Sequence, residues 1–132
     1  FMKRPEMNAC TDGLLGGKPH PRVYGAFPRI LGKYVREDKA LTLEEAVYKM
    51  TKKPATAFNM TDRGELREGA YADITIFNPE TVIDKGTFTD PIQYPEGIEY
   101  VMINGELVVK NGAHTGVRNG VVLRKKGKEV VK

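Results

Sequence analysis

The stretch Ile98-Glu99-Tyr100-Val101-Met102-Ile103-Asn104-Gly105-Glu106-Leu107-Val108-Val109-Lys110 carries the strongest fold signal of the sequence. Two β-prone runs, 98–103 and 106–110, flank the dipeptide Asn104-Gly105. An Asn-Gly pair supplies the two positive φ angles that a type I′ turn requires. The stretch therefore predicts a β-hairpin, which Asn111-Gly112 ends.

Further strands are expected around this hairpin. Asp73–Phe77 is β-branched and alternating, and Asn78-Pro79 stops it. Gly120–Arg124 is a further candidate strand. The second half of the chain thus reads as a sheet.

The first half reads as helices. Thr42 and Glu45 form a capping box, in which each side chain bonds the backbone N–H of the other residue. Phe27–Arg36 also has helical spacing, and Pro54 is expected to end the capped helix and to open a short one. The apolar face of the capped helix consists of Leu43, Ala46, Val47 and Met50. Helices followed by strands indicate an α+β chain with two packing units that divide near residue 62, as 1–62 and 63–132.

Bulk composition fits a globular protein. The 132 residues are 40% hydrophobic and 29% charged, and no apolar run is long enough to span a bilayer. The start, Phe1–Pro5, does not resemble a secretory signal, and a single cysteine is compatible with a reducing compartment, so we expect a cytoplasmic location. The formal net charge is +4, but apart from the run Arg124–Lys128 the basic residues alternate with acidic ones. We expect neither nucleic acid nor membrane as a partner.

Ala9-Cys10-Thr11-Asp12-Gly13 is the first candidate for chemistry. It reads as a short buried strand, with Cys10 as a small buried residue and Asp12 at its carboxyl end. Parallel α/β folds place catalytic groups there, where a carboxylate ligates a metal or accepts a proton from metal-bound water. The alternative is that Asp12-Gly13 is a plain turn.

Three residues of the following loop could face a substrate. Arg22 is suited to a two-pronged hydrogen bond with a carboxylate, and His20 can transfer protons or bind metal. His20 lies between two prolines and could instead shape the loop, while Tyr24 could face substrate or simply pack. His114 reads as a surface turn residue, and two such distant histidines do not form a metal site by themselves.

These residues resemble the last part of the D-aminoacylases, the N-acyl-D-amino-acid deacylases of the amidohydrolase superfamily. The similarity extends from residue 5 to about residue 124. The segment His20-Pro21-Arg22-Val23-Tyr24-Gly25 points to this branch in particular. The other matching segments are Thr11-Asp12-Gly13, Leu43–Thr51, Asp62-Arg63-Gly64, Ala72-Asp73, Phe77-Asn78-Pro79, Asn104-Gly105 and Thr115-Gly116. Thr11 stands where the family usually has serine.

The resemblance implies a fold and a reaction. Family members have a TIM-like (β/α)8 barrel with zinc and a small β-sandwich built from both ends of the chain. Residues 1–62 would then be the last barrel strand, the active-site loop and helices, and 63–132 the C-terminal part of the sandwich. Asp12 would be the catalytic acid/base and a possible zinc ligand, Arg22 would anchor the substrate carboxylate, and His20 and Tyr24 would shape the same site.

The family's other zinc ligands belong to earlier strands that this sequence does not contain, and 132 residues cannot close a barrel. We therefore expect the chain alone to be inactive, and its open strand edges to pair with the N-terminal part of the enzyme or with another copy of the chain. Two alternatives stay open: a non-catalytic association module, and a hydantoinase-like cyclic amidase.

Overall fold

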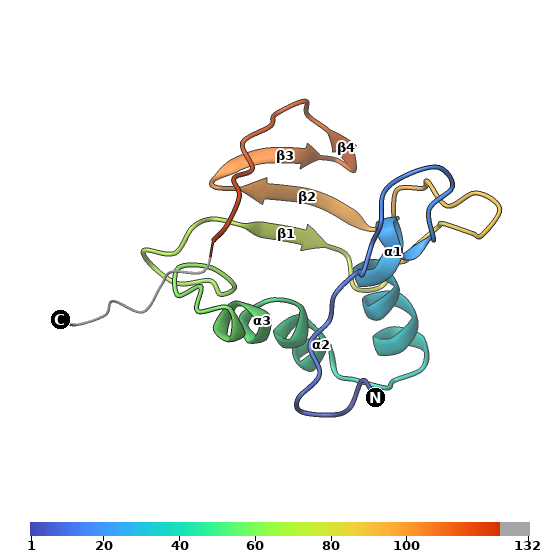
Figure 1. Ribbon diagram of the computed structural model, residues 1–132, viewed down its shortest axis with the longest axis horizontal. Helices are drawn as coiled ribbons and strands as arrows, with labels where there is room; N and C mark the ends of the chain where they lie inside the picture. Colours follow the sequence, from blue (N-terminus) through green and yellow to red (C-terminus); the bar gives the residue numbers. More distant parts are fainter. Residues whose placement is uncertain (125–132) are drawn as a thin grey trace.

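The computed structural model describes residues 1–124 of the chain; residues 125–132, which hold most of the basic run Arg124–Lys128, lie outside the described part. Helices come first and strands afterwards, so the expected α+β class is confirmed (Figure 1). The elements are α1 (Arg22–Arg29), the π-helix η1 (Ile30–Glu37), α2 (Leu43–Met50), α3 (Lys52–Ala57), β1 (Ile74–Phe77), β2 (Ile98–Ile103), β3 (Glu106–Lys110) and β4 (Ala113–His114). In the described part of the chain no helix is long and apolar enough to cross a membrane.

The strands form one antiparallel sheet in the order β1-β2-β3-β4. The hairpin prediction is confirmed, since β2 and β3 pair directly and Asn104 and Gly105 have φ angles of 49° and 84°. His114 is exposed as expected, but it lies in the short strand β4 rather than in a turn. The order of strands leaves β1 at one edge of the sheet.

The capping box is also confirmed. The Glu45 N–H donates to Oγ1 of Thr42 (3.1 Å), and the Thr42 N–H donates to Oε2 of Glu45 (2.9 Å). The predicted end of this helix was wrong, because α2 stops at Met50 and Pro54 lies inside α3. The break occurs at Thr51, whose φ and ψ of −127° and −89° are not helical. Proline is tolerated early in a helix, where the N–H it lacks would have no helical partner.

α1 and η1 follow each other directly and include the predicted helix 27–36. The helical segment begins earlier than predicted, at Arg22, so this residue belongs to a helix rather than to the preceding loop. Pro28 is buried inside α1. Because proline cannot donate a backbone hydrogen bond, the regular pattern is interrupted there, and wider π-helical bonding follows in η1.

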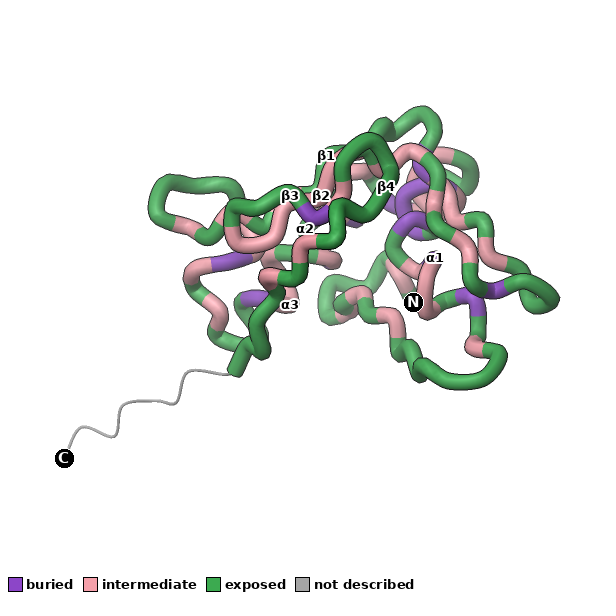
Figure 2. Tube along the Cα trace, turned by 90° about the horizontal axis from the view of Figure 1, so that it is seen from above, coloured by how far each residue is buried: buried purple, intermediate pink, exposed green. Residues whose placement is uncertain are grey.

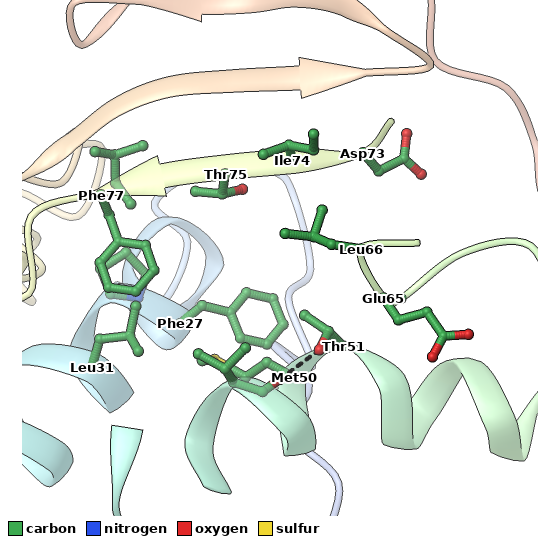
Figure 3. A pocket seen from close by; sticks show the side chains of 14 residues that line it. Phe27, Leu31, Met50, Thr51, Glu65, Leu66, Asp73, Ile74, Thr75 and Phe77 are labelled. Carbon is green, nitrogen blue, oxygen red and sulfur yellow. Dashed lines mark hydrogen bonds between the residues drawn. The ribbon is translucent and has the colours of Figure 1, made fainter. Parts of the chain in front are cut away.

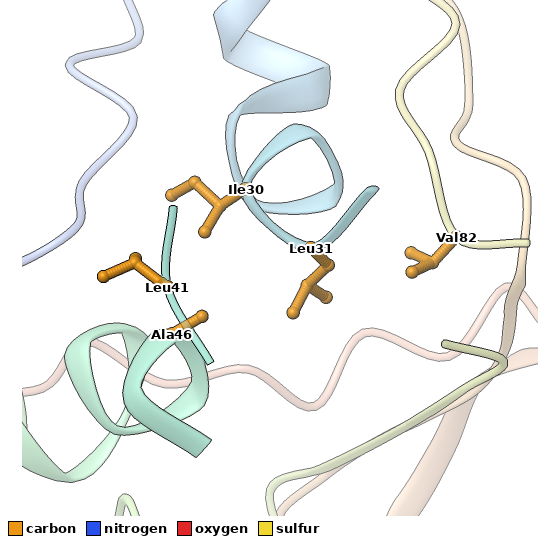
Figure 4. Close-up of a cluster of buried hydrophobic side chains, with 5 residues drawn as sticks. All are labelled: Ile30, Leu31, Leu41, Ala46 and Val82. Atoms are coloured by element: carbon orange, nitrogen blue, oxygen red, sulfur yellow. The ribbon is translucent and has the colours of Figure 1, made fainter. Parts of the chain in front are cut away.

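The buried cluster joins the two halves of the chain. Four of its members come from residues 30–46, and the fifth is Val82, which is fully buried and follows β1 (Figure 4). The members are Ile30, Leu31, Leu41, Ala46 and Val82. Among the strand residues of the described part only Val108 is buried, so the sheet contributes little to this core (Figure 2). The division near residue 62 stays a prediction.

Two predicted strands are absent from the described residues. Ala9–Gly13 and Gly120–Arg124 both lie in irregular backbone, and Cys10 is exposed rather than buried. A strand exists only when its N–H and C=O groups find a partner strand. In this structure the N–H of Ala9 instead donates to the carbonyl of Lys49 (3.1 Å).

Candidate active-site corner

Asp12 and Arg22 form the centre of the candidate site. Nη2 of Arg22 lies 3.0 Å from Oδ2 of Asp12, and its Nε donates to the backbone carbonyl of Asp12 (3.1 Å). Asp12 has a left-handed backbone with φ of 46°, and its side chain is 82% exposed. Arg22 thus holds both the carboxylate and the main chain of one strained residue.

His20 extends this corner. Its Nδ1 accepts the N–H of Arg22 (3.0 Å), the first residue of α1. Its ring stands at 86° to the ring of Phe88, with 5.0 Å between the centroids. His20 therefore supports the residue that binds Asp12. Phe88 was missed in the sequence, because no local pattern links residues so far apart in the chain.

Tyr24 is the least involved of the predicted residues. It is half-buried in the first turn of α1, where its N–H donates to the carbonyl of Pro21 (3.1 Å). Hydrogen bonds thus join Asp12, His20 and Arg22. Tyr24 lies in the same part of the chain, but no side-chain hydrogen bond links it to these three residues in the described structure.

The start of α1 packs against the segment that follows β1. A Cβ atom on Gly25 would lie 2.7 Å from Cβ of Asp84, so only glycine allows this approach. The Asp84 carboxylate, 8% exposed, lies 3.1 Å from Nη1 of Arg29. This hydrogen bond and charge raise the pKa of Arg29 above its ordinary value.

The described residues do not by themselves form a metal site. Among residues 1–124 there is no group of three or more His, Cys, Asp and Glu side chains that could hold an ion. Asp12 offers one carboxylate, and Arg22 already binds one of its oxygens. A zinc ion at this corner needs further ligands from outside the described residues.

An apolar hollow lies away from this corner. A groove of about 410 Å³ lies between the helices and β1, with mainly apolar side chains around it (Figure 3). Its two acidic residues are engaged in ion pairs, Glu65 with Lys52 and Asp73 with Arg63. The groove thus offers packing surface rather than reactive groups.

The chain is similar in sequence to known amidohydrolases. Residues 12–109 match the model of the amidohydrolase family. The N-acyl-D-glutamate deacylase of Alcaligenes xylosoxydans xylosoxydans is 47% identical over 116 residues, which are 87% of this chain and 24% of that protein. The resemblance to the D-aminoacylase branch is thereby confirmed. The chain spans about a quarter of this curated relative.

Solved structures agree in fold as well. A crystal structure of D-aminoacylase, described as defining a novel subset of amidohydrolases, is 42% identical with a TM-score of 0.79, over 81% of this chain and 23% of that one. The N-acyl-D-glutamate deacylase of Bordetella bronchiseptica, solved with zinc and a phosphonate mimic of the tetrahedral intermediate, is 47% identical with a TM-score of 0.68. That match covers 69% of this chain and 19% of the other. The chain therefore belongs to the amidohydrolase family.

Proposed function

We propose that this chain is the C-terminal part of a zinc-dependent enzyme that hydrolyses the amide bond of N-acyl-D-amino acids. The observation that carries the proposal is Asp12, an exposed carboxylate fixed by two hydrogen bonds from Arg22. The 47% identity to an N-acyl-D-glutamate deacylase supports the substrate class. Residues 9–13 would be the last barrel strand, paired only when the preceding strands are present.

Asp12 acts as the acid/base of the reaction. Arg22 binds Oδ2, which leaves Oδ1 to accept a proton from the attacking water. The water oxygen bonds to the amide carbon, the carbon–nitrogen bond breaks, and Asp12 returns the proton to the leaving amine. Zinc, whose ligands would lie mostly outside this chain, would supply Lewis-acid polarisation of the amide carbonyl when bound.

Arg22 also binds the substrate carboxylate in this proposal. Its contacts with Asp12 use the edge formed by Nε and Nη2. The guanidinium has five N–H donors, so the edge that carries Nη1 can bind a second carboxylate. His20 and Tyr24 belong to the same turn as Arg22, and in this proposal they also face the substrate.

The remaining part of the enzyme is the proposed partner. Only an N-terminal part that supplies barrel strands and zinc ligands completes this corner, and β1 at the edge of the sheet is open to a further strand. A second copy of this chain would pair strands, but it would only repeat the same described residues, among which there is no group of three or more metal-ligating side chains. A self-associating, non-catalytic module is therefore the alternative function.

A hybrid enzyme tests the proposal. This chain replaces the matching quarter of the N-acyl-D-glutamate deacylase of Alcaligenes xylosoxydans xylosoxydans. We expect zinc-dependent release of D-glutamate by the hybrid, and none by the 132-residue chain alone. Asp12→Asn should lower kcat by about 10²- to 10⁴-fold, the range typical for loss of a general acid/base. Arg22→Ala should raise KM as well as lower kcat.

The matched control is Asp38→Asn, which removes another exposed carboxylate, 3.4 Å from Nζ of Lys33. It should leave both kinetic constants unchanged. A folded, zinc-loaded hybrid without deacylase activity would contradict the proposal, and so would an Asp12→Asn hybrid that keeps full activity. A stable homo-oligomer without metal or activity would favour the association module.

A further inference from the structure

The segment between β1 and β2 follows the helices closely. A Cβ atom on Gly32 would lie 2.4 Å from the carbonyl oxygen of Val82, and one on Gly25 would lie 2.7 Å from Cβ of Asp84. The backbone at Gly25 and Gly32 therefore lies so close to Val82 and Asp84 that neither glycine has space for a methyl group.

The same contact continues toward the candidate active-site corner. A Cβ atom on Gly86 would lie 3.4 Å from Cβ of Pro21, and two residues further the ring of Phe88 meets the ring of His20. Residues 84, 86 and 88 thus lie against residues 25, 21 and 20, which run from α1 toward the loop before it. In Figure 1 the gold loop after β1 and the blue loop before α1 lie beside each other at the top of α1.

Phe88 is connected to Asp12 through two residues. Its ring meets His20 edge to face, His20 Nδ1 accepts the N–H of Arg22, and Arg22 holds Asp12 at two atoms. Each step is a direct contact, with 5.0 Å between ring centroids and 3.0 Å for the hydrogen bond.

Burial of apolar surface does not explain this phenylalanine. Phe88 is 75% exposed, so it adds little to the core. Tyr94 in the same loop is similarly exposed, at 80%, but no ring contact joins it to His20 in the described structure. The contact of Phe88 with His20 is what distinguishes the two aromatic residues.

We propose that Phe88 is a positioning residue for the catalytic corner: its ring fixes His20, and His20 fixes the start of α1 and the Arg22 side chain that holds Asp12. The inference rests on the proposed function for its catalytic consequence, but the positioning itself does not depend on activity. It makes the loop between β1 and β2, which belongs to the strand-rich half, part of the active site.

Nuclear magnetic resonance of the 132-residue chain tests the positioning directly. The chain has two histidines, so the imidazole signals of His20 and His114 are easily separated. Phe88→Ala should shift the His20 signals and the Arg22 Nε–H signal, which is assigned by its loss in Arg22→Lys. His114 should not move, and Tyr94→Ala should leave both corner signals in place. If Phe88→Ala leaves the Arg22 Nε–H signal unchanged, the proposal is overturned.

Kinetics of the hybrid enzyme test the consequence. Phe88→Ala should lower kcat about 10-fold or more, because small misplacements of a catalytic group cost up to about 10²-fold. KM should also rise, but less than in Arg22→Ala, because Phe88 acts on Arg22 only through His20. Phe88→Tyr should keep the kcat of the unmodified hybrid, since the ring is retained and the 75% exposed side chain has room for a hydroxyl. Tyr94→Ala should leave kcat unchanged. An unchanged kcat in Phe88→Ala overturns the proposal. An unmodified hybrid without activity counts instead against the proposed function, and the resonance experiment then decides on the positioning.

Discussion

Replacing Gly32 by alanine should destabilise the protein, although alanine is the better helix former. Gly32 is buried in η1. The added Cβ would lie 2.4 Å from the Val82 carbonyl oxygen and 2.5 Å from Cδ1 of Ile83. The carbonyl cannot move away freely, because it accepts a hydrogen bond from Nη1 of Arg36 (2.7 Å).

Two effects of opposite sign set the magnitude. Alanine in place of glycine in a helix interior contributes about 1 kcal/mol of stability. Overpacking of a closely packed site costs about 1–3 kcal/mol, and contacts this short with backbone atoms fall at the upper end of that range. The net change in the free energy of unfolding is therefore a loss of about 1–2 kcal/mol. For a chain of this size it corresponds to a decrease in Tm of about 3–10 °C.

Urea and thermal denaturation of the full chain, followed by circular dichroism, measure this loss. The control is Gly120→Ala, because a Cβ at Gly120 meets nothing within 4 Å. This control should change the free energy of unfolding by no more than about 0.5 kcal/mol. A Gly32→Ala chain as stable as the original, or more stable, would refute the close contact between η1 and the segment after β1.

Three further predictions concern local features. Thr42→Ala removes the N-cap of α2 and should lower the urea-measured free energy of unfolding by about 1 kcal/mol. The hydrogen bond from Lys52, followed by that from Arg67, lowers the pKa of Glu65 below its ordinary 4.5. The ionised Glu65 therefore stabilises the fold at pH values above its pKa in the unfolded chain, and this stabilisation is lost as the pH falls through its lower pKa in the folded chain. Lys52→Gln should raise the pKa of Glu65, as measured by a carboxyl resonance titration. Asn104→Ala keeps a positive φ without the side-chain hydrogen bonds and should cost about 2–3 kcal/mol in thermal denaturation.

Part of the candidate site could be predicted from the sequence. Asp12 and the loop with His20 and Arg22 stand out as residue types, and the structure joins all three. The hydrogen bonds from Arg22 to Asp12 could not be predicted, because the two residues are ten positions apart and only the fold of the loop brings them together. From the sequence, Arg22 was expected to face a substrate. Phe88 and Asp84 reach the corner from the other half of the chain, and only packing brings them there.

The sequence by itself determined the features that depend on neighbouring residues. Thr42 and Glu45 satisfy each other's backbone N–H groups within one turn, and Asn104-Gly105 adopts positive φ angles without help from distant residues. Such elements form from local hydrogen bonds and backbone preferences, so a short stretch is sufficient to predict them.

Only the tertiary structure decided the features that need distant partners. Residues 9–13 have the sequence of a strand but pair with no strand among the described residues, so their backbone is irregular. The same holds for residues 120–124. Conversely, Val82 enters the cluster of Ile30 and Leu31, although the sequence places it in another unit. Strand pairing and burial depend on which surfaces meet in space, and no local pattern contains that information.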